Sequence, residues 1–173
     1  MSGTASESGP GGLTHLDAAG EARMVDVSAK AVTVRTATAA GRVRLSAACV
    51  AVLRSGDVPK GDALAVARIA GIMAAKKTPE LVPLCHPLMI SGVDVQAEVT
   101  DDGVTLTATV RTAERTGVEM EALTAVSVAG LAIIDMIKAI DRDAMITDVR
   151  VIAKSGGRSG DYRRPGEPRA GTP

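Results

Sequence analysis

Several short segments of the chain alternate between apolar and polar residues, as half-buried β-strands do. In two of them Val or Leu alternates with Thr and Arg, and two others lie on either side of Asp101-Asp102-Gly103. That tripeptide is typical of a hairpin turn, so the segments that flank it are predicted to pair as antiparallel strands. The segments are residues 32–34, 43–45, 93–99, 104–110 and 149–153.

Three other segments carry the signals of α-helices. Ser46 can cap a short helix, and Asp62 is a favourable N-cap for a helix over residues 63–77 that ends in two lysines. The third segment is uncharged over thirteen consecutive residues, 122–134, and is predicted to end near Asp141. A helix that is apolar on all sides is buried, and this one is too short for a bilayer, which needs about 20 apolar residues.

With the first two strand segments taken as one region and the two helices after them as another, the predicted elements follow one another in the order β-α-β-β-α-β. This is the ferredoxin-like arrangement of the α+β class, with an antiparallel sheet and helices on one of its faces. Residues 13–163 are expected to form a single domain, and segments 1–12 and 164–173 are expected to be disordered tails. Ferredoxin-like domains that recognise RNA stack bases on strand aromatics. The strands here have none, which argues against RNA recognition.

Composition sets further limits. Lys plus Arg and Asp plus Glu number 20 each, so no net charge indicates nucleic acid or a membrane surface as a partner. Cys49 and Cys85 form neither a CxxC pair nor a disulfide framework, and residues 1–12 lack an apolar signal core. We therefore expect a cytoplasmic protein with reduced thiols. We also expect a homo-oligomer, rather than the charged and Gly-rich tails, to cover the outer side of the uncharged helix.

Charged residues flank the uncharged helix. Glu121 precedes it, and Asp135 and Lys138 follow it three positions apart, where they can face one another. The pair is either a structural ion pair or a proton-transfer pair. Its expected place at the end of a buried helix favours proton transfer, because burying charge for stability alone is costly.

Two basic loops are candidate anion sites. Lys60 precedes a helix N-terminus, which favours an anion, although a solvated loop lysine fits the same local pattern. Lys154 and Arg158 flank Ser155-Gly156-Gly157, whose N–H groups could surround a phosphate, although Gly-rich ends are often only flexible. His86 lies between two prolines, where a lone histidine usually bonds to backbone. The His and Cys spacings do not match a zinc site.

Six sequence blocks, taken together, resemble one known family. In chain order they are Met24–Ser28, Lys60–Asp62, Leu84–Leu88, Gly117–Thr124, Asp135–Ala139 and Ala153–Gly157. The combination resembles the cyclic pyranopterin monophosphate synthases, the C-protein family of molybdenum cofactor biosynthesis, from about Leu13 to Tyr162. The resemblance stops at the two tails.

This resemblance implies an activity, a site and an assembly. Members of the family are lyases that rearrange 3′,8-cyclised dihydro-GTP to cyclic pyranopterin monophosphate and release diphosphate. By resemblance, Asp135, Lys138 and Lys60 carry the acid–base work. The residues that line the substrate site are then Leu84, Cys85, His86, Glu119, Met120 and Glu121. The assembly implied is a hexamer built from dimers, with sites at the dimer interface.

The chemistry of that substrate agrees with the available residues. A triphosphate carries about four negative charges at neutral pH, so a chain without net charge must gather cations locally. The candidates are Lys60, Lys138, Lys154 and either Arg35 or Arg158. No cofactor is expected, and any Mg²⁺ would bind with the substrate phosphates. Two competing hypotheses are a non-catalytic nucleotide sensor, which explains only the cationic loops, and an oligomerisation module, which explains only the uncharged helix.

Overall fold

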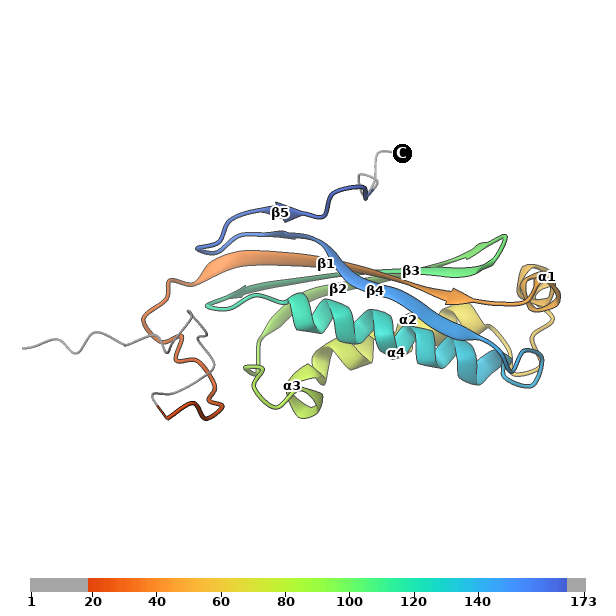
Figure 1. Ribbon diagram of the computed structural model, residues 1–173, viewed down its shortest axis with the longest axis horizontal. Coiled ribbons are helices and arrows are strands. Elements are labelled where there is room, and N and C mark those ends of the chain that lie inside the picture. Colours follow the sequence, from red (N-terminus) through yellow and green to blue (C-terminus); the bar gives the residue numbers. More distant parts are fainter. Residues whose placement is uncertain (1–18, 168–173) are drawn as a thin grey trace, which may run out of the picture.

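A five-stranded antiparallel sheet forms one layer of the fold, with its strands in the order β2-β3-β1-β4-β5 (Figure 1). The strands are β1 (Thr33–Arg44), β2 (Ile90–Thr100), β3 (Gly103–Glu114), β4 (Met145–Ser155) and β5 (Tyr162–Arg163). The computed structural model describes residues 19–167. The order of the first four strands is that of a ferredoxin-like fold, so the predicted α+β class is confirmed, and β5 extends the sheet beyond β4.

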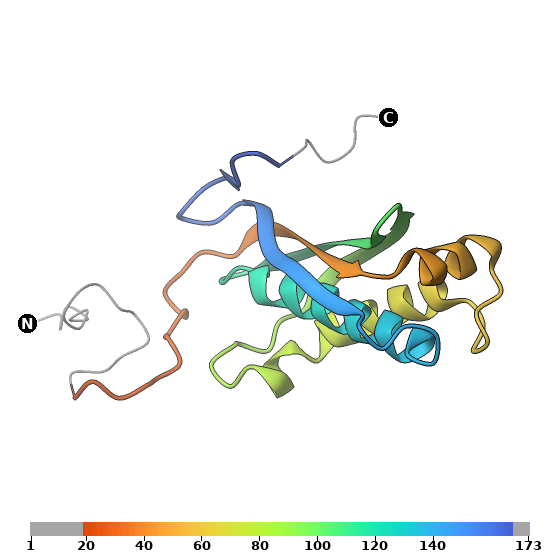
Figure 2. The same cartoon turned by 45° about the vertical axis from the view of Figure 1, so that its right-hand side comes forward.

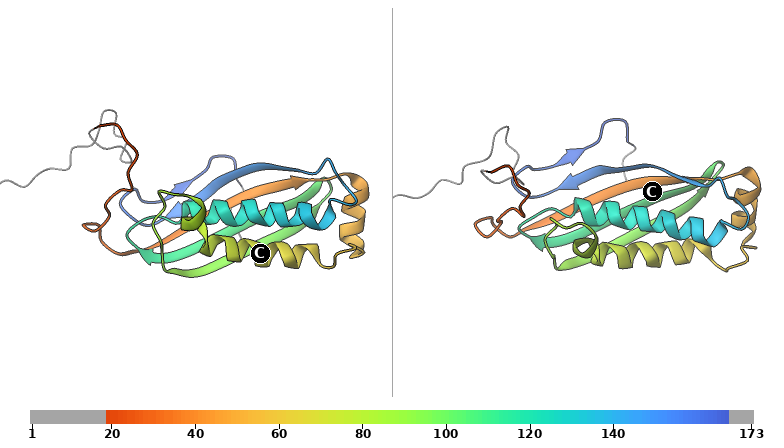
Figure 3. Two further views of the ribbon diagram at one scale, coloured as in Figure 1. Left: turned by 90° about the horizontal axis from the view of Figure 1, so that it is seen from below. Right: turned by 60° about the horizontal axis from the view of Figure 1, so that its bottom comes forward.

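Within residues 19–167, the helices cover one face of this sheet and no helix lies on the other (Figures 1 and 3). They are α1 (Ala47–Ser55), α2 (Ala63–Lys76), α3 (Thr78–Leu81) and α4 (Glu119–Ile137). Both predicted N-caps are confirmed, because Ser46 Oγ accepts the Cys49 N–H at 3.3 Å and Asp62 Oδ1 accepts the Ala65 N–H at 2.9 Å. The predicted Asp-Asp-Gly turn joins β2 to β3.

Strand β1 is longer than the sequence pattern indicates. The segments predicted at residues 32–34 and 43–45 lie at the two ends of one strand. Between them Ala37 and Ala39 point into the core and are at most 1% exposed, but their small side chains give a weak hydrophobic signal. Gly41 lets helix α4 approach the backbone of β1 closely, because an added Cβ would lie 2.6 Å from Cγ1 of Val126 on α4.

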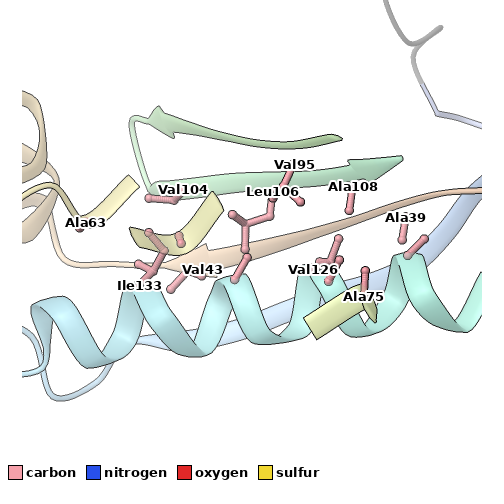
Figure 4. Packing of buried hydrophobic residues seen from close by; sticks show 14 of the residues in the cluster. Ala39, Val43, Ala63, Ala75, Val95, Val104, Leu106, Ala108, Val126 and Ile133 are labelled. Atoms are coloured by element: carbon pink, nitrogen blue, oxygen red, sulfur yellow. The ribbon is translucent and has the colours of Figure 1, made fainter. Parts of the chain in front are cut away.

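The core between the sheet and the helices is built from aliphatic side chains. Figure 4 shows Val126 and Ile133 of α4 lying between that helix and Leu106 of the sheet, and all three are at most 1% exposed. Small residues also bring α2 against α4, because a Cβ added at Gly71 would lie 2.9 Å from the Ala125 carbonyl oxygen. The absence of large aromatic side chains from the core is therefore matched by closely packed backbones.

Helix α4 is buried on one side only. Glu121 in its first turn is 3% exposed, whereas Leu131 is 57% exposed and the Asp135 side chain is 58% exposed. The single chain therefore leaves the outer side of this helix exposed, which is the side that a homo-oligomer is expected to cover. The physical reason is that α4 packs on the sheet with α2 beside it, and no third layer covers its outer face within residues 19–167 (Figure 3).

The C-terminal end of α4 differs from the sequence prediction. The helix ends at Ile137 rather than near Asp141, and a tighter turn follows, in which the Ile140 N–H donates to the Ile137 carbonyl three residues earlier at 2.7 Å. The prediction that this helix is too short for a bilayer is wrong on length, because α4 alone among the described residues is long and apolar enough to cross a membrane. Half of its most apolar stretch is, however, buried inside this fold.

The first residues after β5 remain bonded to β4, and Figure 2 shows the chain turning back from the end of β4 into β5. The Arg164 N–H donates to the Ile152 carbonyl at 2.8 Å, and Arg150 Nε donates to Glu167 Oε1 at 2.5 Å. The segment expected to be a tail from residue 164 thus begins with residues that contact the sheet. The expected tail residues 1–12 and 168–173 lie outside the described part of the chain.

Candidate active site

The site residues predicted from the sequence gather at the two opposite ends of α4. The residues around its N-terminal end are Leu84, Cys85, His86, Glu119, Met120, Glu121 and Lys154. The residues at its C-terminal end are Lys60, Asp135 and Lys138. Glu121 and Asp135 are 14 positions apart in α4, which corresponds to about 21 Å at a rise of 1.5 Å per residue. The two groups are therefore two separate clusters in one chain.

The predicted residues at the N-terminal end of α4, except Lys154, line a cavity of about 240 Å³. Six of its lining residues were predicted, three from the segment before β2 and three from the first turn of α4. Lys30 and the segment around Val25 and Val27 close its side, and Gly117 precedes the helix. An added Cβ at Gly117 would lie 1.9 Å from a carboxylate oxygen of Glu119, so this glycine leaves room for that side chain.

Glu121 is the buried acid of this cavity. Burial raises its pKa, and the negative charge of Glu119 raises the pKa further. Burial also raises the pKa of the Cys85 thiol, and the nearby Glu121 carboxyl adds to that shift. A desolvated carboxyl that lines a cavity can accept hydrogen bonds from the N–H groups of a polar heterocycle, and it keeps its proton to a higher pH than an exposed carboxyl does.

His86 connects the cavity wall to the segment before β1. Its Nε2 lies 2.8 Å from the Val25 carbonyl oxygen, so Nε2 carries the proton and donates. The backbone hydrogen bond expected for a lone loop histidine is therefore present. In the neutral ring Nδ1 remains an acceptor, so the residue can hold the wall and still bond to a ligand.

A second cavity, of about 230 Å³, adjoins the first and is strongly cationic. Four basic side chains line it, namely Lys30, Arg35, Arg115 and Lys154, together with one carboxylate, Glu119. Lys30 and Glu119 line both cavities, so the two cavities lie side by side. Such a cluster is suited to a polyanion, which can replace the repulsion among the cations with attraction.

Backbone contacts hold these basic groups in place. Arg35 Nε donates to the Glu114 carbonyl at 2.9 Å, and Arg115 Nε donates to the Lys30 carbonyl at 2.9 Å. Lys154 Nζ lies 3.0 Å from Glu119 Oε1. The sequence prediction for Lys154 named phosphate, whereas in this structure the ammonium is paired with Glu119 across the boundary of the two cavities.

The Ser-Gly-Gly loop after β4 forms one wall of the cationic cavity. Gly156 has φ of +87°, and an added Cβ would lie 2.2 Å from the Val34 carbonyl oxygen. Gly157 has φ of +74°, and its Cβ would lie 2.2 Å from the Arg35 guanidinium. Both positions therefore require glycine. Of the two arginines that the sequence left open, Arg35 lines this cavity, and Arg158 is not among its lining residues.

The sequence reasoning missed Lys30 and Arg115. One residue precedes β1 and the other follows β3, and the register Thr33↔Glu114 brings these strand ends together. A search for basic residues just outside the paired ends of neighbouring antiparallel strands would have found them.

Lys60, Asp135 and Lys138 form the second cluster. Asp135 Oδ1 lies 2.8 Å from Lys138 Nζ and Asp135 Oδ2 lies 3.0 Å from Lys60 Nζ, which also donates to the Asp135 main-chain oxygen at 2.7 Å. Hydrogen bonds from Lys138 and then Lys60 lower the pKa of Asp135, so its carboxylate is charged at neutral pH. The predicted pairing is confirmed.

The exposure of this second cluster differs from the prediction. The side chains of Asp135 and Lys138 are 58% and 61% exposed, and that of Lys60 is 43% exposed. The expected burial of the pair is therefore wrong for the single chain, because the C-terminal end of α4 faces solvent. Among residues 19–167, no three His, Cys, Asp or Glu side chains are placed to hold a metal ion together.

Comparisons with known proteins agree on one family. A model described as the MoaC family matches residues 24–157. A cyclic pyranopterin monophosphate synthase of Streptomyces griseus subsp. griseus is 68% identical over 152 residues, which cover 88% of this chain and 86% of that protein. One of Nocardioides sp. is 65% identical over 159 residues, covering 90% and 98%. Cyclic pyranopterin monophosphate synthase 2 of Mycobacterium tuberculosis is 58% identical over 160 residues, covering 92% and 96%.

Proposed function

This chain belongs to the MoaC family, and we propose that it converts 3′,8-cyclised dihydro-GTP to cyclic pyranopterin monophosphate and diphosphate in molybdenum cofactor biosynthesis. It is thus a lyase that acts on a nucleotide-derived small molecule. The names of its relatives support this function over a nucleotide sensor, and so does the acid–base cluster, for which mere binding gives no reason. We expect it to work in the cytoplasm and without a redox cofactor.

The observation that carries the proposal is the pair of adjoining cavities at the N-terminal end of α4. One holds the buried Glu121 carboxyl, which suits the N–H groups of a guanine-derived ring. The other holds four basic side chains, which suit a triphosphate with about four negative charges. We infer that the ring binds in the first cavity and the phosphates in the second, with Lys30 and Glu119 at the junction.

The acid–base cluster supplies groups for the bond changes. In the proposed reaction a ribose-derived oxygen attacks the α-phosphorus, and the bond from that phosphorus to its bridging oxygen breaks, so that diphosphate leaves with the bonding electrons. The attacking hydroxyl gives its proton to a base of the acid–base cluster, and further protons move on and off ring nitrogen and carbon. Lys60 and Lys138 are held on opposite oxygens of the Asp135 carboxylate, an arrangement suited to moving a proton from one side of a substrate to the other.

A site shared between two subunits would bring the two clusters together. A compact nucleotide cannot contact both ends of one α4, which are about 21 Å apart. If two copies of α4 run antiparallel across a two-fold axis, Glu121 of one subunit approaches Asp135 of the other, and each dimer has two such sites. We propose this arrangement, within a hexamer built from dimers.

Exposed apolar residues on the helical layer support association. Val66, Ile69 and Met73 of α2 are 42%, 60% and 55% exposed, and their spacing places them along one side of that helix. Leu131 on α4 is 57% exposed. A second copy that packs against this layer would remove these side chains from water, which favours association at about 25 cal/mol per Å² of apolar area buried.

The test is direct. Incubation of the pure protein with cyclised dihydro-GTP should release diphosphate and the tricyclic pterin without any added redox cofactor. The Asp135→Asn variant is the matched control, because it preserves the shape of the side chain and removes its charge. Ligand binding without diphosphate release by a folded wild-type preparation would favour the nucleotide sensor instead.

A further inference from the structure

Asp141 follows α4 and bonds to the start of a distant helix. The residue is 7% exposed, and its Oδ2 accepts the Ser46 N–H at 2.6 Å while Oδ1 accepts the Asp143 N–H at 3.1 Å. The backbone hydrogen bond from Ser46 lowers the pKa of Asp141, so the buried carboxylate is charged at neutral pH. Ser46 is the N-cap of α1 and lies 95 positions earlier in the chain.

This contact replaces one that helices usually make locally. In a capping box the N–H of the N-cap residue bonds to a Glu or Gln side chain at the third helical position. In α1 that position is Cys49, which cannot serve, and Asp141 provides the acceptor from a position 95 residues later in the chain. A local acceptor would have capped α1 equally well, whereas the distant acceptor also joins α1 to the end of α4.

The joined segments carry the acid–base cluster. Helix α1 ends at Ser55 and leads into a turn anchored by Val58, which is 7% exposed and accepts the Gly61 N–H at 2.9 Å. Lys60 lies in this turn, and its Nζ reaches the Asp135 side chain and main chain, 75 positions away. Figures 1 and 3 show α1 at the same end of the molecule as the C-terminal end of α4.

We propose that Asp141 is a positioning residue for the reaction, which fixes Lys60 against Asp135 by tying the first turn of α1 to the end of α4. This inference rests on the proposed function for its consequence on the rate. The residue acts through Lys60 and does not contact the substrate. Loss of Asp141 should therefore lower the rate of the chemical step and leave substrate binding in the cavities unchanged.

Asp141→Ala should lower kcat by about 10- to 100-fold, since a displacement of about 1 Å in a reacting group costs rates of that order. KM should stay within about threefold, because neither Asp141 nor Lys60 lines the proposed binding cavities. Asp141→Asn keeps one oxygen acceptor for the Ser46 N–H and should retain kcat within about threefold of wild type.

A double-mutant cycle separates positioning from general destabilisation. In a Lys60→Met background, Asp141→Ala should reduce the remaining kcat no further, because the group it positions is absent. Leu106→Ala in the centre of the core is the control for stability, and its effect should be the same in both backgrounds. Equal reductions by Asp141→Ala in both backgrounds would overturn the proposal.

A second pair of variants changes Ser46, the donor of the hydrogen bond to Asp141. Ser46 has φ of −65°, which proline adopts without strain, so Ser46→Pro deletes the N–H donor to Asp141. Ser46→Ala removes only the hydroxyl cap and leaves that donor in place. The proposal predicts a loss of kcat for Ser46→Pro that clearly exceeds the loss for Ser46→Ala, and equal losses would contradict it.

An NMR titration tests the geometry without any turnover. The ¹³C signal of the Asp135 carboxyl, assigned with Asp135→Asn, should titrate at a higher midpoint in Asp141→Ala than in wild type, as it should in Lys60→Met. An unchanged midpoint in Asp141→Ala would overturn the positioning role. Absence of diphosphate release by the wild-type protein would contradict the proposed function, and the titration would still decide the role of Asp141.

Discussion

Two inactive variants that fail in different clusters should restore activity when mixed, if the site is shared between subunits. Glu121→Ala removes the buried acid of the ring cavity, and Asp135→Asn disables the cluster at the other end of α4. The two positions are about 21 Å apart along one helix, so one chain cannot bring both to a single nucleotide. In a mixed dimer with antiparallel helices, one site combines two intact halves and the other combines two defective halves.

The expected recovery follows from random pairing. If the fraction x of subunits carries one variant, mixed dimers make up 2x(1 − x) of the total, and each has one intact site of two. Activity relative to wild type is then x(1 − x), which gives about 0.25 for an equal mixture and about 0.19 for a mixture of one to three. Diphosphate release after subunit exchange, with exchange verified by native mass spectrometry, measures this curve.

A matched control uses two variants that fail in the same cluster. In a mixture of Asp135→Asn with Lys138→Ala every site keeps a defective acid–base cluster, so no recovery is expected at any ratio. Background activity in the Glu121→Ala and Asp135→Asn mixture, in spite of verified exchange, would refute the shared site.

Further predictions concern binding, pH and packing. Asp135→Asn should abolish turnover and leave ligand affinity within about tenfold of wild type, or about 1.4 kcal/mol. Lys154→Ala should instead weaken ligand binding, which calorimetry measures, and the reverse pattern would show that the two roles are exchanged. Burial raises the pKa of Glu121 above its ordinary value of 4.5, so between these two pKa values the folded protein keeps a proton that the unfolded chain has lost. The free energy of unfolding of the wild type should therefore fall as the pH rises from 4.5 through the raised pKa. Thermal unfolding of Glu121→Gln should lack this fall, and parallel pH curves for the two proteins would contradict the shift. Gly71→Ala should destabilise by about 1–3 kcal/mol, because its Cβ would meet a backbone oxygen of α4 at 2.9 Å. Gly92→Ala, with open space around its Cβ, should cost clearly less in the same denaturant titration.

Much of the local structure could be predicted from the sequence, because its determinants are close together in the chain. The caps at Ser46 and Asp62 are set by residues within one helical turn, and the Asp-Asp-Gly hairpin is set by three adjacent residues. Strand β1 was harder to predict as one unit. Its middle is packed with Ala37, Ala39 and Gly41, whose burial depends on the helix that lies across them.

The candidate site could be predicted in part. The sequence blocks identified six residues of one cavity and the three members of the acid–base cluster. The cations Lys30 and Arg115 and the link through Asp141 depend on strand register and on a contact across 95 positions, which no local pattern carries. The exposure of Asp135 was also unpredictable, because it depends on whether another layer covers α4.

A crystal structure of the Asp135→Asn variant with cyclised dihydro-GTP bound tests the shared site most directly. We predict the guanine-derived ring beside Glu121 and the phosphates among Lys30, Arg35 and Lys154 of one subunit. Residue 135 of a second subunit should lie within about 3.2 Å of the ligand, directly or through one water. A ligand whose nearest residue 135 belongs to the same subunit as its nearest Glu121 would contradict the shared site.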